Sequence, residues 1–134
     1  MTRLILEILV LILWLLFAES LLAQARIGYT EKQIKSEFAN YNFKTAYTKD
    51  NTKYIYWEDA DLISAYYLDN KNISYACIIV PKKQGILNYL VESYNKKYVI
   101  ISETQWKMYN NNGIVNIELV FRDGATFIRF TDSN

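Results

Sequence analysis

The change of hydrophobic period within residues 85–109 constrains the fold more than any other feature of this sequence. Apolar or aromatic residues first recur every three or four positions, which predicts a helix, and then every second position, which predicts a strand. The helical set is Ile86, Leu87, Leu90, Tyr94 and Tyr98, and the strand set is Tyr98, Ile100, Ser102, Thr104, Trp106 and Met108. This stretch therefore predicts a helix that runs directly into one strand, with the change near Tyr98.

A similar helix followed by strands lies upstream. Thr30 can cap this first helix while the side chain of Gln33 reaches back to the backbone of Thr30, and the helical pattern continues to about residue 41. A polar loop over 47–53 follows. The strand-like runs of this half are residues 54–58, 62–69 and 73–80, joined by short polar turns.

The C-terminal part completes a second half with the same order of elements. Polar and apolar residues alternate over 115–122, Asp123-Gly124 is a tight hairpin signal, and a last strand covers 125–131. The predicted fold class is α+β, with two αβββ units that form an antiparallel sheet covered by the two helices on one face. Two separate sheets, one for each half, are the alternative.

The first 25 residues have the pattern of a targeting segment. Arg3 gives a cationic start, an uninterrupted apolar run covers 8–18, and Ala23-Gln24-Ala25 fits an A-x-A cleavage site. A membrane-spanning helix needs about 20 apolar residues, so the pattern favours a cleavable signal peptide over an anchor. We therefore predict a signal peptide over 1–25, a single domain over 26–134 without a stable membrane span, and an extracytoplasmic location, periplasmic or secreted. An uncleaved anchor or a buried N-terminal helix is the alternative.

The composition excludes several kinds of chemistry. The chain contains no histidine, the commonest general base and a common zinc ligand. The net charge is only +1, and the basic residues do not cluster beyond the pairs Lys82-Lys83 and Lys96-Lys97. Nucleic-acid binding is therefore not expected. We predict no catalytic residues, no metal site and no cofactor.

Cys77 is the only cysteine of the chain. It lies in an apolar run over 75–80, which favours a small buried side chain in a strand. An intermolecular disulfide is the alternative, because exported proteins meet an oxidising environment.

Aromatic residues in the predicted strands are the strongest functional signal. Tyrosine and tryptophan supply a large contact area together with a polar group. Alternation places Tyr54 and Tyr56 on one face of their strand and Trp57 on the other. We predict a binding surface formed by Tyr54, Tyr56, Trp57, Tyr67, Trp106 and Tyr109. The alternative is that most of these residues fill the core.

The segment 28–34, Gly-Tyr-Thr-Glu-Lys-Gln-Ile, follows the predicted export signal. It resembles the Gly-x-Thr helix start of small BamE-like outer-membrane assembly proteins and of the related beta-lactamase-inhibitor-protein-like fold, which is built from α-then-β units. The chain lacks the lipid-bearing cysteine of the assembly proteins. The resemblance implies a non-catalytic, protein-binding module on the outer side of the inner membrane.

Three classes of function follow from these observations. The first is an exported, non-catalytic module that binds another extracytoplasmic or cell-envelope protein through its aromatic sheet face. The second binds glycans or another small molecule with the same face. The third is an acid-dependent hydrolase that uses Glu58, Asp59 or Asp61. The oligomeric state is left open.

Overall fold

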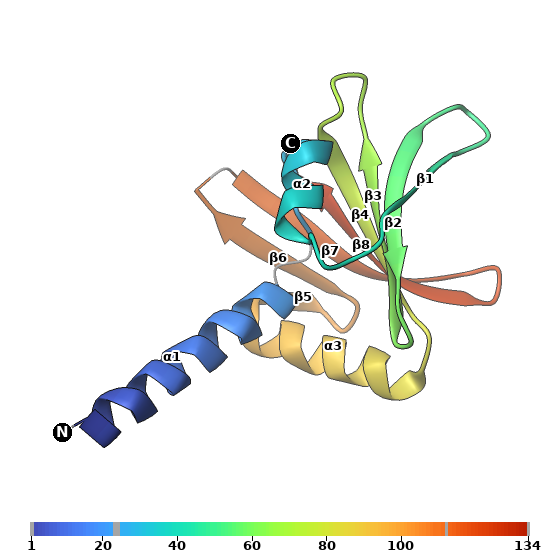
Figure 1. Ribbon diagram of the computed structural model, residues 1–134. Helices are drawn as coiled ribbons and strands as arrows, with labels where there is room; N and C mark the ends of the chain where they lie inside the picture. Colours follow the sequence, from blue (N-terminus) through green and yellow to red (C-terminus); the bar gives the residue numbers. More distant parts are fainter. Residues whose placement is uncertain (1, 23–24, 112, 134) are drawn as a thin grey trace.

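The computed structural model describes residues 2–22, 25–111 and 113–133. These residues form three helices and one eight-stranded antiparallel sheet with the strand order β1-β2-β3-β4-β8-β7-β6-β5 (Figure 1). The helices are α1 (Thr2–Leu22), α2 (Glu31–Glu37) and α3 (Gln84–Lys97). The strands are β1 (Lys44–Tyr47), β2 (Lys53–Glu58), β3 (Leu62–Leu68), β4 (Ser74–Pro81), β5 (Val99–Ser102), β6 (Gln105–Asn110), β7 (Gly113–Arg122) and β8 (Ala125–Asp132). The predicted α+β class is confirmed.

The sheet consists of two meanders. The first half of the domain is α2 with β1 to β4, and the second half is α3 with β5 to β8. The last strands of the two halves pair with each other, with Cys77 opposite Phe130 and Ile79 opposite Ile128. Because of this pairing there is one sheet, and the alternative of two separate sheets is wrong. Both α2 and α3 are followed by four described strands, one more than predicted.

The additional strand of the first half is β1, at one edge of the sheet. It pairs with β2, from Lys44 opposite Tyr56 to Tyr47 opposite Lys53, and its last residue falls in the predicted polar loop. The turn is closed by the Thr52 backbone N–H, which donates to Thr48 Oγ1 at 3.0 Å. The sequence of β1 has no apolar alternation, so the strand forms because β2 offers it backbone partners.

The additional strand of the second half arises because a turn divides the one predicted strand into two. The single strand predicted over 98–109 is a hairpin of β5 and β6, with Ser102 opposite Gln105 and Ile100 opposite Trp106. The turn residues Glu103 and Thr104 include neither glycine nor proline, and the period of two continues through them. The pattern therefore did not indicate the reversal of the chain.

The start of α2 is built as the sequence predicts. The Gln33 backbone N–H donates to Thr30 Oγ1 at 3.2 Å, and the Thr30 N–H donates to Gln33 Oε1 at 2.9 Å, so the capping box is present. Before it, Gly28 has a φ of +86°, which favours glycine, and its N–H donates to the Ser74 carbonyl at 2.8 Å. The helix ends at Glu37, a turn earlier than predicted.

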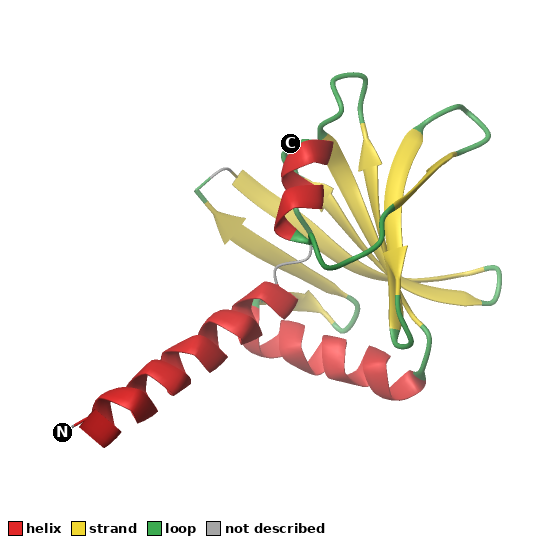
Figure 2. Ribbon diagram, in the orientation of Figure 1, coloured by secondary structure: helices red, strands yellow, loops and turns green. Residues whose placement is uncertain are grey.

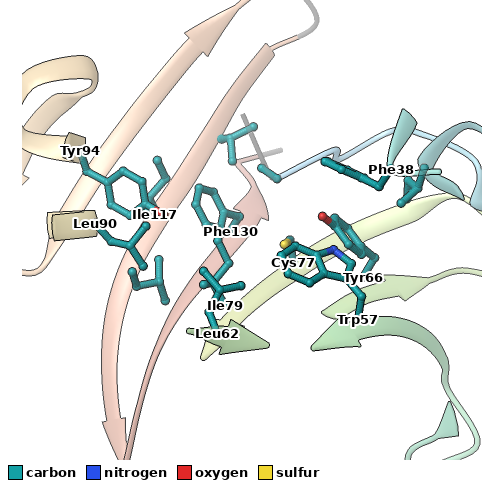
Figure 3. Packing of buried hydrophobic residues seen from close by; sticks show 14 of the residues in the cluster. Phe38, Trp57, Leu62, Tyr66, Cys77, Ile79, Leu90, Tyr94, Ile117 and Phe130 are labelled. Carbon is teal, nitrogen blue, oxygen red and sulfur yellow. The ribbon is translucent and has the colours of Figure 1, made fainter. Parts of the chain in front are cut away.

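Both α2 and α3 cover the same face of the sheet, as predicted (Figure 2). Phe38, at the end of α2, stacks on Tyr66 with ring centroids 6.2 Å apart. Tyr94 of α3 meets Phe130 edge to face at 5.8 Å. Because Tyr66, Cys77 and Phe130 face one another across β3, β4 and β8, these contacts lie on one side, called here the core face (Figure 3). The opposite side is called the open face.

The helix α1 precedes the domain, and its N-terminal end points away from the sheet (Figure 1). Its side chains from Leu4 to Ile12 are exposed. Among the described residues no helix is long and apolar enough to cross a membrane. Ala23 and Gln24 of the predicted cleavage site lie outside the described residues, whereas Ala25 is buried in the core cluster. The signal peptide stays a prediction.

Candidate functional site

Three tyrosines form a cluster on the open face of the first half, called here the tyrosine patch: Tyr54, Tyr56 and Tyr67. Tyr54 and Tyr67 lie opposite each other on β2 and β3. Their rings are stacked, with centroids 5.1 Å apart and an interplanar angle of 26°. The ring of Tyr56 lies 5.8 Å from that of Tyr54. The structure thus brings together three of the predicted binding residues.

The sheet register explains why these rings stand above their surroundings. Tyr56 lies opposite Ala65, and Tyr67 lies opposite Ala76. Both alanines are buried, and the three tyrosines are half-buried. Small residues beside large rings leave the upper edges of the tyrosine rings raised above this part of the sheet.

The surroundings of the tyrosine patch are apolar. Ile63, Ile78 and Val80 lie on the same face of β3 and β4, because Ala65 pairs with Ile78 and Ile63 pairs with Val80. All three are half-buried. This low-polarity environment raises the pKa of Tyr67, mainly through burial and to a smaller extent through the neighbouring Tyr54. Alternation along β3 places only Ile63 on the face of Tyr67, whereas Ile78 and Val80 reach the patch through the pairing of β4 with β3.

Trp57 does not belong to this surface, contrary to the prediction. It is 2% exposed and lies on the core face, where Tyr41 stacks on its ring with centroids 4.0 Å apart. Trp57 directly follows Tyr56 in β2, so the two side chains must point to opposite faces.

Trp106 is also a core residue rather than part of the binding surface. It is 1% exposed and lies opposite Ile117 on the core face. Its Nε1 donates a hydrogen bond to Asn95 Oδ1 at 2.8 Å, and the Tyr94 ring meets it edge to face at 5.8 Å. The helix α3 therefore covers Trp106 completely, which a strand pattern alone cannot reveal.

Tyr109 is exposed, but it lies away from the tyrosine patch. It is on β6, and three strands, β4, β8 and β7, separate β6 from β3 in the sheet. Its exposed fraction is 59%. Tyr109 therefore cannot contribute to the same small contact surface as Tyr54, Tyr56 and Tyr67.

The open face of the second half carries polar and charged residues in its centre. Arg129 Nη2 and Glu118 Oε2 form an ion pair at 2.6 Å across β7 and β8. Lys107 and Asn116 lie opposite each other on the same face of β6 and β7. Apolar side chains continue on this face, because Val120 pairs with Phe127 and both are half-buried. The cluster of three tyrosines in ring contact lies in the first half.

The acidic residues considered for hydrolysis occupy an exposed hairpin turn between β2 and β3. The side chain of Asp59 accepts hydrogen bonds from the backbone N–H groups of Asp61 and Leu62 at 2.8 and 2.9 Å. Glu58 pairs with Lys82 at 2.6 Å, and the hydrogen bond and charge of Lys82 lower the pKa of Glu58 below its ordinary value. A general acid needs a raised pKa, so this arrangement is that of a structural turn.

Cys77 lies in the centre of the core face (Figure 3). Burial raises the pKa of its thiol to about 12. Close to it lie Trp57 Nε1, Ser64 Oγ and the Tyr66 hydroxyl, and within the described residues none of these three groups has a hydrogen-bond partner in good geometry. The interpretation of Cys77 as a buried strand residue is confirmed, and its fully buried position leaves no room for a disulfide to a second chain.

A surface pocket lies at one end of the sheet. It has a volume of about 370 Å³ and is lined by Tyr29, Asp69, Ser74, Tyr75 and Asn110, among others. Tyr54, Tyr56 and Tyr67 are not among its lining residues. In the described part of the chain no group of three or more histidine, cysteine, aspartate or glutamate side chains could hold a metal ion.

Comparisons with protein-family models, with curated proteins and with solved structures found no match for this chain. The resemblance to BamE-like proteins therefore remains a prediction from the segment 28–34 and from the order of the elements.

Proposed function

We propose that this chain is a small, non-catalytic binding protein that contacts another protein through the tyrosine patch. The observation that carries the proposal is a group of three half-buried tyrosines in ring contact, surrounded by aliphatic side chains on the sheet face that the described helices α2 and α3 do not cover. Tyrosine rings provide much contact area at a low cost in side-chain entropy, and their hydroxyl groups can hydrogen-bond across an interface.

The packing of the rings favours a protein over a glycan as the partner. Sugar-binding sites use the free face of an aromatic ring, and here Tyr54 and Tyr67 cover each other's faces at 5.1 Å. The ring edges and hydroxyl groups that remain suit the mixed apolar and polar contacts of a protein surface. Glycan binding is kept as an outcome of the test.

The test compares Tyr54→Ala and Tyr67→Ala with Tyr89→Ala. Tyr89 lies on α3 and is 56% exposed, so its variant removes an equally large ring from a different surface. A photo-cross-linking amino acid at position 56 should capture a protein partner, and the two patch variants should lose this capture at least tenfold while Tyr89→Ala keeps it. Equal capture by all three folded variants would remove the proposal. Binding to a glycan array that disappears with Tyr67→Ala would favour the alternative.

We further propose that the partner is another extracytoplasmic or cell-envelope protein, because residues 1–25 have the pattern of an export signal. The mass of the protein recovered from cells tests this point. Cleavage after Ala25 would leave Arg26 as the first residue. A protein that keeps its first 25 residues and stays in the cytoplasm would contradict the proposed location but not the binding role of the tyrosine patch.

A further inference from the structure

The strand β5 is an exposed, apolar edge of the sheet. It is the last strand in the sheet order and pairs with β6 alone among the described strands. Val99, Ile100 and Ile101 are 50%, 55% and 50% exposed. An edge strand presents unpaired backbone N–H and C=O groups, and proteins usually protect such edges with charged residues. Here the strand itself carries no charge.

The other edge of the sheet is more polar. The strand β1 begins with Lys44 and Thr45 and has one large exposed ring, that of Tyr47, whereas β5 has three exposed aliphatic residues in succession. The difference singles out β5 as the edge that a further strand can join. Pairing of this kind supplies backbone hydrogen bonds, and the apolar side chains then bury one another.

The charges that flank β5 have opposite signs at its two ends. Lys97 precedes the strand and Glu103 follows it. Lys97 lies 5.9 Å from the centre of the Tyr98 ring, and neither Lys97 nor Glu103 forms an ion pair with another described residue. The neighbouring Lys96, by contrast, is already paired with Glu92.

We propose that β5 pairs with β5 of a second copy of this chain, antiparallel and about a two-fold axis at Ile100. In this register Ile100 meets its own copy and Val99 lies opposite Ile101. Lys97, the last residue of α3, and Glu103, in the turn after β5, then come close to each other at both ends, so the segments that flank the strand are complementary in charge. A two-fold interface uses one surface twice, which is the commonest symmetry of protein dimers. Because β5 has only four residues, the dimer should depend on concentration.

The first test is oxidative cross-linking of the full chain in mild detergent. A cysteine on the two-fold axis lies directly opposite the same cysteine of the second copy. Disulfide formation requires Cβ atoms about 4 Å apart, so only close pairing of the two strands allows it. Ile100→Cys should therefore give a dimer at twice the chain mass of 15.8 kDa, with a yield that rises with concentration. Tyr89→Cys is the control for random collision, because Tyr89 is as exposed as Ile100. Cys77 is buried and stays silent.

The second test exchanges the flanking charges in the Ile100→Cys protein. Lys97→Glu or Glu103→Lys alone places like charges close to each other and should lower the initial cross-linking rate about fivefold. The two changes together restore opposite charges and should restore the rate. Lys71→Glu, in the turn between β3 and β4, should have no effect. Cross-linking no faster than for Tyr89→Cys, or a combined variant that remains slow, would overturn the proposal.

Discussion

In the first half of the domain, α2 has seven residues and the open face of the sheet carries the tyrosine patch. In the second half, α3 has 14 residues and the open face carries the ion pair of Glu118 and Arg129. Each half places a tryptophan on the core face. In the second half, Asn95 in the last turn of α3 accepts a hydrogen bond from Trp106 Nε1. In the first half, Trp57 Nε1 has no hydrogen-bond partner in good geometry among the described residues.

This difference shows that the same order of helix and strands can be packed in two ways. The longer helix α3 brings both apolar residues and a polar partner to its half of the core. The shorter α2 contributes mainly Ile34 and the adjoining Phe38, and the first half keeps buried polar atoms beside Cys77. The second half is therefore expected to be the better packed scaffold, and the first half the part that offers a contact surface.

The largest expected effect is the loss of a core tryptophan. Trp106→Ala should lower the free energy of unfolding by about 3–5 kcal/mol, because it leaves a large cavity beneath α3. Urea unfolding followed by circular dichroism measures this loss. Two phenylalanine variants compare the halves. Trp106→Phe should lower the free energy of unfolding by about 1 kcal/mol more than Trp57→Phe, since only the first change removes a good hydrogen bond. Equal losses for the two phenylalanine variants would contradict the contrast between the halves.

Alkaline pH should destabilise both halves. Burial raises the pKa of Cys77 and of Tyr98 to about 12, and it also raises the pKa of Tyr66 and Tyr94. The folded protein therefore holds protons that the unfolded chain releases above its own values of 9.0 for cysteine and 10.0 for tyrosine. The free energy of unfolding should fall as pH rises through this range, by roughly 2–3 kcal/mol between pH 8 and pH 10.

Urea titrations at pH 8, 9 and 10 test this prediction. In Cys77→Ala the fall should begin about one pH unit later, because the tyrosines of the unfolded chain release their protons at a higher pH than the thiol. Stability that does not change up to pH 10 would show that these groups are less buried than described.

The N-terminal cap of α2 should contribute about 1 kcal/mol to the free energy of unfolding. Thr30→Ala removes the side-chain acceptor of the Gln33 N–H and breaks the capping box. Thr30→Ser keeps the acceptor and serves as the control, with a loss of less than half that size. Thermal unfolding measures both, and equal losses would mean that the hydroxyl group does not stabilise the helix.

The smallest expected effect is a gain in stability at the N-cap position of α3. Lys83 has an extended backbone at the N-cap, and its side chain makes no capping hydrogen bond. Lys83→Ser should therefore stabilise the protein by about 0.5 kcal/mol, because serine can accept from the first free N–H groups of α3. A loss of stability would show that the weak contact of Lys83 with Asp61 at 3.5 Å matters more than the cap.

Several elements could be predicted from short-range patterns. The capping box of α2, the apolar stripe of α3, and the strands β2, β3, β4, β7 and β8 follow from residues close together in the sequence. The turn at Asp123-Gly124 also follows, and both of its residues have a positive φ as such a hairpin requires. Of the candidate site, alternation already placed Tyr54 and Tyr56 on the face opposite Trp57.

The remaining features depend on contacts between distant residues. The turn at Glu103 and Thr104 forms because β6 pairs with β7, and Trp106 is buried because α3 lies over it. Neither contact can be predicted from the residues next to it in the sequence. The separation of Tyr109 from the tyrosine patch likewise follows from the order of the strands.

The sequence by itself determined the fold class, the N-terminal cap of α2 and most strands, because hydrophobic period and turn chemistry are local properties. Only the tertiary structure decided that β4 pairs with β8, that both tryptophans of the predicted surface are buried, and that three tyrosines share one open face. The physical reason is that burial and strand order depend on which distant segments pack together, and many pairings are compatible with the same local pattern.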